Sequence, residues 1–120
     1  MIKPSIGITE KNLKAVTGIL SVVLADAVML YTKTRKFHWN VSGESFMEYH
    51  KLFEEQYQEL EEAIDEIAER INKLGSNTIG TTKEFAALTQ IKEAPGKYPK
   101  SIDMVKELLK DHETVIVSLR

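Results

Sequence analysis

Two histidines and three acidic residues recur at helical intervals in one stretch of the chain. They are His38, His50, Glu54, Asp65 and Glu69. Imidazole nitrogens and carboxylate oxygens together form a common ligand set for iron, manganese and zinc. The stretch therefore predicts a metal site, and its spacing decides which of these side chains could share one ion.

A helix following Ser45 places four of these side chains on one face. At ~100° per residue, and with His50 at zero, Glu54 lies near ~40°, Asp65 near ~60° and Glu69 near ~100°. The apolar residues of the same segment centre near ~290°, so the four polar side chains flank the core. The chain also lacks the Glu-x-x-His pattern of di-iron sites built inside a helical bundle. We therefore expect this face to point out of the bundle.

The length of this helix divides the candidate ligands into two groups. Glu54 and Asp65 lie ~16 Å apart along the axis, whereas one ion binds oxygens at about 2–2.6 Å. A hairpin would return His38 to His50, which gives one group of His38, His50 and Glu54 and another of Asp65 and Glu69. A second copy packed about a two-fold axis would join the two groups into equivalent composite sites. The spacing thus predicts a dimer as the smallest active unit.

Each candidate also has a structural interpretation. Asp65 and Glu69 could belong to a solvated acidic face, and His38 could cap the first helix. Trp39 is more often an amphipathic core anchor than a redox partner. His112 lies on the apolar stripe of the last helix, where a satisfied structural histidine is the commoner role.

Two long helical patterns carry the candidate ligands. The first runs from about Thr9, its N-cap, to about Phe37. The second opens with the capping-box pattern Ser45-x-x-Glu48 and ends at Gly75. Apolar residues recur every three or four positions in both: Leu13, Val16, Leu20, Val23, Ala27 and Leu30, then Phe53, Tyr57, Leu60, Ile64, Ile67, Ile71 and Leu74.

A short helix and a third long helix follow. Thr81-x-x-Glu84 predicts a capping box for the short one, with Phe85 and Leu88 pointing inward. A linker with two prolines comes next, and Ser101 caps the last helix. Its stripe is Val105, Leu108, His112, Val115 and Leu119. Three long helices usually need a fourth to close their core, so we expect a single all-α domain over residues 1–120 that is truncated at its C-terminus; a natural three-helix form is the alternative.

Composition narrows the class of protein. The chain has 120 residues, 42% of them hydrophobic, no cysteine and a formal net charge of -2. Zinc–thiolate and disulfide chemistry are excluded, and the missing basic arm argues against DNA binding. We expect the cluster Lys33, Arg35 and Lys36 to stabilise a helix C-terminus. The sequence has no uninterrupted stretch of about 18 apolar residues and no secretion-signal pattern. We therefore predict a cytoplasmic protein without a membrane span.

Two motifs resemble one family closely. They are H-W-N-V-S-G-x-S-F from residue 38 and D-E-I-A-E-R-I-N-K-L-G from residue 65, with His50 twelve residues after His38. Together they resemble the Dps-like miniferritins (DNA-protection-during-starvation proteins), over about residues 9–120. The resemblance implies a ferritin-like four-helix bundle, with the fourth helix missing from this chain, and assembly as a hollow dodecamer. It also implies a ferroxidase that oxidises Fe(II), typically with hydrogen peroxide, and stores ferric iron.

The resemblance assigns the candidate ligands to an iron site between two subunits. His38, His50 and Glu54 match the ligands from one subunit, and Asp65 and Glu69 match those from the other. The family more commonly has aspartate at the position of Glu54, and Trp39 matches a tryptophan beside the site for which electron donation is conceivable. A non-catalytic helical binding or structural module that has lost cage assembly is the alternative function.

Overall fold

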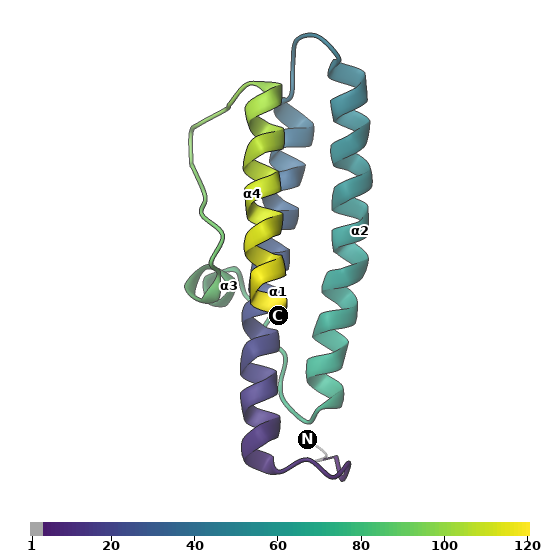
Figure 1. The fold of residues 1–120 in the computed structure, drawn as a ribbon, viewed down its shortest axis with the longest axis vertical. Coiled ribbons are helices and arrows are strands. Elements are labelled where there is room, and N and C mark those ends of the chain that lie inside the picture. The colour runs from purple at the N-terminus through teal and green to yellow at the C-terminus, as the bar shows by residue number, and fades with distance from the viewer. Residues whose placement is uncertain (1–3) are drawn as a thin grey trace.

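The computed structural model describes residues 4–120, which form four helices and no strand. The helices are α1 (Glu10–Asn40), α2 (Phe46–Lys73), α3 (Thr82–Leu88) and α4 (Ser101–Leu119). α1 and α2 form a long antiparallel hairpin, and α4 lies beside the C-terminal half of α1 (Figure 1). α1 contacts all three other helices. The prediction of an all-α bundle is confirmed. The predicted absence of a basic arm rests partly on residues 1–3, which lie outside the described residues.

Three predicted helix ends are confirmed. The hydroxyl of Thr9 accepts a hydrogen bond from the amide of Asn12 at the start of α1. Thr81 and Glu84 form the reciprocal capping box of α3. Gly75 follows α2 with φ of 89°, a left-handed conformation that glycine adopts without steric cost. These capping signals depend only on neighbouring residues, so they occur in the structure at the positions that the sequence predicts.

Two other predicted side-chain caps are wrong. Ser45 directly precedes α2 as predicted, but it has the left-handed φ of 60° and its side chain makes no capping hydrogen bond. An N-cap side chain needs extended backbone to reach its amide. Ser101 is already the first residue of α4, because Met104 donates its amide to the carbonyl of Lys100.

The core lies where α1, α2 and α4 meet near the α1–α2 turn. Its buried members come from all three helices and from the turn: Leu30, Phe37, Val41, Phe53, Met104 and Leu108. Burying such side chains stabilises a fold by about 1.5–3 kcal/mol each. This packing fixes the end of the hairpin that carries both histidines of the candidate site.

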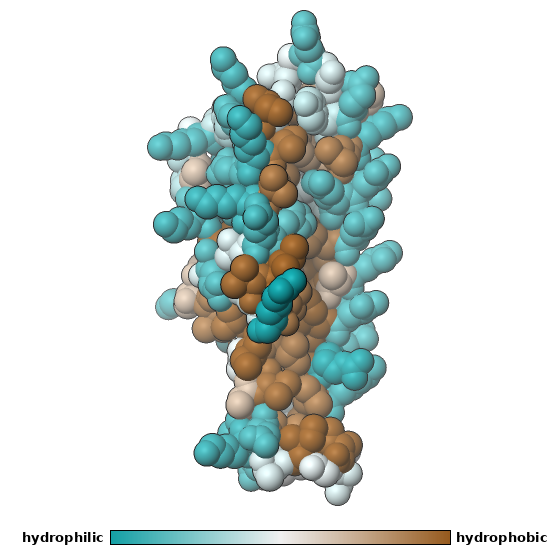
Figure 2. All heavy atoms as spheres, viewed as in Figure 1, coloured by the Kyte–Doolittle hydropathy of each residue, from teal (hydrophilic) through white to brown (hydrophobic). Residues whose placement is uncertain are grey.

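The predicted apolar stripes are only partly buried. Val23, Ala27 and Leu30 are buried on α1, but Val16 is 42% exposed and Leu119 on α4 is 63% exposed. Leu88, which was predicted to point inward, is exposed as well. Figure 2 shows apolar side chains gathered between α2 and α4 and beyond the end of α4. Within the described residues, the other helices cover α1 fully only at its C-terminal end.

The central helix is more apolar than expected. An 18-residue window of α1 has a mean hydropathy of 1.9, so by length and composition alone this helix could cross a membrane. Ser21 and Asp26 still interrupt its most apolar run, so no uninterrupted apolar stretch of that length occurs. The helix also carries Asp26, which is fully buried and accepts hydrogen bonds from Thr89 and Gln90. Contacts with α2, α3 and α4 account for an apolar helix at the centre of a bundle.

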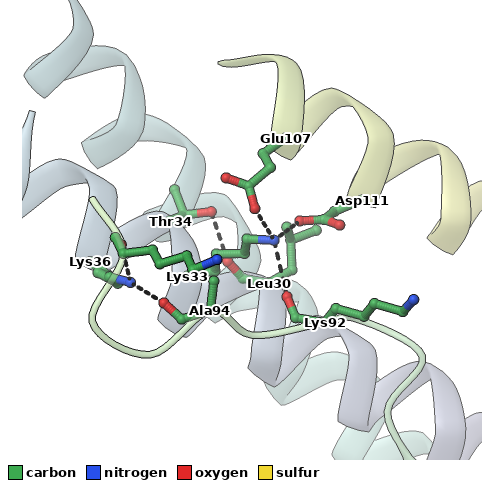
Figure 3. A network of polar contacts seen from close by, with 9 residues as sticks. Leu30, Lys33, Thr34, Lys36, Lys92, Ala94, Glu107 and Asp111 are labelled. Atoms are coloured by element: carbon green, nitrogen blue, oxygen red, sulfur yellow. Dashed lines mark hydrogen bonds and ion pairs between the residues drawn. The ribbon is translucent and has the colours of Figure 1, made fainter. Parts of the chain in front are cut away.

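Residues 89–100, here called the strap, link α3 to α4 and are held against α1 by two lysines (Figure 3). Lys33 Nζ lies 2.7 Å from Asp111, 3.2 Å from Glu107 and 3.1 Å from the carbonyl of Lys92. The Lys33–Asp111 contact is an ion pair between two largely buried side chains. Lys36 donates to strap carbonyls at Ala94 and Lys97.

These lysines correct the expectation for the basic cluster. α1 continues to Asn40, so Lys33 and Lys36 lie one to two turns before its end instead of compensating its terminal carbonyls. Their charges hold the strap and α4, while Arg35 points to a different set of side chains.

Replacing Lys33 with methionine should lower the free energy of unfolding by about 2 kcal/mol, because Asp111 would keep a largely buried charge without its partner. Urea denaturation followed by circular dichroism measures this change. Lys106→Met on the exposed side of α4 is the matched control and should stay within about 0.5 kcal/mol of the parent. Equal losses in both variants would contradict the role given to Lys33.

The N-terminus of α3 should be sensitive to acid. The hydroxyl of Thr81, the amide of Gly80 and the amide of Thr81 all donate to Glu84 and hold the pKa of that carboxyl below its ordinary value. The capping contribution is therefore full above the ordinary glutamate range and is lost as the pH falls through the lowered pKa of Glu84. NMR shifts of the α3 amides should report this transition, and it should move to higher pH in Thr81→Val.

Candidate metal centre

The turn between α1 and α2 brings His38 and His50 into direct contact. The two imidazole rings stack with centroids 3.7 Å apart and planes 17° from parallel. His38 is buried, and His50 is half-buried. The prediction that a hairpin returns His38 to His50 is confirmed.

Each histidine is held by the backbone of the other. His38 Nδ1 lies 2.7 Å from the carbonyl oxygen of His50, and His50 Nδ1 lies 2.8 Å from that of His38. A carbonyl only accepts, so both Nδ1 atoms must carry the proton. In the neutral rings this leaves the lone pair on Nε2, which is the arrangement of a metal-binding histidine fixed by its second nitrogen.

This exchange also completes the end of α1. The last four carbonyls of a helix have no partner within it, and His38 is among the last residues of α1. His50 supplies the donor that the carbonyl of His38 needs. The His50 side chain, and not that of His38, therefore caps this helix, so one pair of contacts serves both the fold and the candidate site.

Aromatic rings surround the histidine pair on both sides. Tyr57 presents its edge to His38 at 5.2 Å and 74°, and Phe46 stacks on His50 at 5.1 Å. Sequence analysis assigned Tyr57 only to the core stripe and did not assign Phe46 to the site. The signal was their spacing: Phe46 lies one helical turn before His50, and Tyr57 lies two turns after it.

The carboxylates remain in two groups on α2. Glu54 is half-buried one turn beyond His50, whereas Asp65 and Glu69 are exposed further along the helix. We call His38, His50 and Glu54 the histidine half-site, and Asp65 and Glu69 the acid half-site. Among residues 4–120, no three His, Asp or Glu side chains lie close enough together to hold one metal ion. The joining of the half-sites by a second copy stays a prediction.

Two further candidates lie outside this cluster. Trp39 is 65% exposed and contacts the guanidinium of Arg35, so its interpretation as a core anchor was wrong. His112 is half-buried on α4, as its stripe position suggested, but has no hydrogen-bond partner within residues 4–120. The satisfied structural role proposed for His112 is therefore not supported.

The tautomers of the two stacked histidines can be measured directly. Long-range ¹H–¹⁵N correlation spectra at neutral pH should show His38 and His50 with the proton on Nδ1, because each Nδ1 donates to a carbonyl. His112 is the internal control and should show a mixture of tautomers. Protonated Nε2 atoms on the stacked pair would contradict the assignment.

Comparison with known proteins agrees with this architecture. A sequence model of the ferritin-like domain family matches residues 18–120. A structure of DpsC from Streptomyces coelicolor covers 98% of this chain with a TM-score of 0.92 at 28% identity, and this chain covers 68% of it. A Dps structure from Vibrio cholerae covers 98% of this chain with a TM-score of 0.90 at 29% identity, and this chain covers 74% of it. The helices and the matched model define a ferritin-like protein.

The curated relatives narrow that class. DNA protection during starvation protein 2 of Bacillus anthracis is 40% identical over 108 residues, which are 89% of this chain and 73% of the relative. The chain belongs to the Dps-like miniferritins within the ferritin-like family. A low temperature-induced protein of Nostoc is 42% identical over 97% of this chain, which spans 65% of that relative's length.

Proposed function

We propose that this protein is a ferroxidase that oxidises Fe(II) with hydrogen peroxide at sites shared between two subunits and stores the ferric product. Family membership supports iron chemistry, and the Vibrio cholerae relative is described as one of the ferritin-like diiron-carboxylate proteins. The observation that carries the proposal for this chain is the paired Nδ1–carbonyl contact of His38 and His50, which leaves two Nε2 lone pairs free. Five ligands would come from the two half-sites.

The donor set suits a change from Fe(II) to Fe(III). Neutral imidazole and carboxylate both bind iron, and carboxylate charge favours the more highly charged Fe(III). Two Fe(II) ions would each lose one electron, and the O–O bond of peroxide would accept both. With two protons the peroxide leaves as two water molecules, so no hydroxyl radical is released. A site holding iron in pairs suits this two-electron step.

The spacing of the half-sites makes a second copy necessary. Their carboxylates lie ~16 Å apart along one rigid helix, so one chain cannot close a site around an ion. A two-fold partner in antiparallel register would place its acid half-site against the histidine half-site and repeat the arrangement. By family resemblance, we propose assembly of such dimers into a dodecamer in the cytoplasm.

Mixed variants test both the activity and the shared site. Stopped-flow oxidation of Fe(II) by peroxide should fall to the uncatalysed rate in His50→Ala and in Asp65→Ala, since each removes a ligand from both sites. An equimolar mixture should recover about a quarter of the parent rate, because half of the dimers would be mixed and each would hold one intact site.

Two controls sharpen this test. Glu59→Gln lies on the opposite face of α2 and should keep the parent rate. If the mixture recovers nothing although the parent is active, the site lies within one chain. If all variants match the parent, the ferroxidase proposal fails and the alternative of a non-catalytic helical module is favoured; light scattering then reports whether that module assembles.

A further inference from the structure

Arg35 is held in one orientation beside the histidine half-site. Its guanidinium carbon lies 4.3 Å from the ring centre of Tyr57, 5.2 Å from that of Trp39 and 5.8 Å from that of Tyr31. Arg35 also donates a hydrogen bond of 3.0 Å to the hydroxyl of Tyr31. Tyr57 in turn contacts His38, so Arg35 is one aromatic ring away from the candidate metal ligands.

This cation has unused bonding capacity. A guanidinium carries five N–H donors, and Arg35 uses one of them on Tyr31. Within residues 4–120 no carboxylate lies at ion-pair distance from it. The hydrogen bond that Arg35 donates to Tyr31 raises the pKa of Arg35, and the negative charge of Glu61 does so to a smaller degree. A fixed, permanently charged fork that faces out of the bundle fits a carboxylate from outside the chain.

Glu61 lies in the middle of the half-site face of α2. On the wheel that places His50 at zero, Glu61 falls near ~20°, between His50 and the acid half-site. It is exposed, and it was not counted among the predicted ligands. It therefore belongs to the surface that a two-fold partner would cover, without being needed to bind iron.

The two-fold register brings the two copies of Glu61 together. When the middle of the histidine half-site on α2, near residue 52, faces the middle of the partner's acid half-site, near residue 67, the axis crosses α2 near residue 59 or 60. Glu61 then lies ~2 Å from the level of that axis. Two carboxylates that approach each other away from water repel strongly, so a cation is needed at this place.

We propose that Arg35 of each subunit binds Glu61 of the partner subunit across this two-fold axis, and that the two pairs set the register of the composite iron sites. The inference rests on the proposed shared site and names the contact that aligns it. Arginine, tyrosine and tryptophan are the residues that most often dominate binding energy at interfaces. Tyr57 and Trp39 supply the aromatic contacts that keep Arg35 in place.

A charge-reversal mixture separates contacts between chains from contacts within one chain. Arg35→Glu alone and Glu61→Arg alone should each weaken dimerisation at least about tenfold in sedimentation velocity, since like charges would then meet at both pairs. An equimolar mixture should recover dimers, because both pairs across the axis become attractive in the mixed dimer. Within each chain the charges stay repulsive, so a purely internal contact would give no recovery.

Glu59→Arg is the matched control, with the same charge change on the opposite face of α2, and should dimerise like the parent. A mixture that stays monomeric while the parent dimerises overturns the Arg35–Glu61 pair and leaves the proposed function standing. If mixing the two variants restores dimers but the parent protein does not oxidise Fe(II), the proposed function is overturned and the Arg35–Glu61 pair stands. A parent that stays monomeric at all concentrations overturns both.

Discussion

The contact on which the rest of the structure depends is the exchange of hydrogen bonds between His38 and His50. Each side chain reaches the backbone of the other across the α1–α2 turn. The exchange satisfies a carbonyl at the end of α1, connects the two helices of the hairpin and selects the tautomer that leaves Nε2 free. A change at either histidine would therefore alter fold and chemistry together.

The second constraint is the rigidity of α2. A helix rises by ~1.5 Å per residue, so groups separated by three turns cannot converge on one ion however their side chains rotate. The chain therefore presents two incomplete half-sites on an outward face, and the core stripe of the same helix packs elsewhere. Any function that needs all five ligands must use two chains, and the quality of their alignment then controls the chemistry.

Much of this arrangement could be predicted from the sequence because its causes are local or periodic. The three- and four-residue spacing of the apolar residues predicted the helices, and Gly75 and Thr81 predicted two of the helix ends. The return of His38 to His50 followed from a hairpin alone. The absence of a capping hydrogen bond from Ser45 could not be predicted, because this residue adopts a left-handed conformation in the turn, where an N-cap side chain needs extended backbone.

The missed features depend on neighbours that are distant in sequence. Arg35 was placed in a basic cluster at a helix end, whereas its position is set by a ring from α2. Lys33 holds groups on the strap and on α4, which no helical periodicity on α1 reveals. Leu88 lies on the apolar side of α3, but too few residues surround this short helix to bury its side chain. The sequence pattern predicts which face of a helix a residue occupies, but not which other element packs against that face.

α1 shows how one helix meets several such demands at once. Leu30 and Phe37 face the core, Lys33 and Lys36 face the strap, and Arg35 faces α2 and the exposed surface. Residues three or four apart share a face, so three interleaved sets can coexist within two turns of helix. A rotation of α1 that improved one set would displace the others. The histidine half-site is thus held by the combined fit of core, strap and aromatic contacts, and that rigidity is what a site completed by a second chain requires.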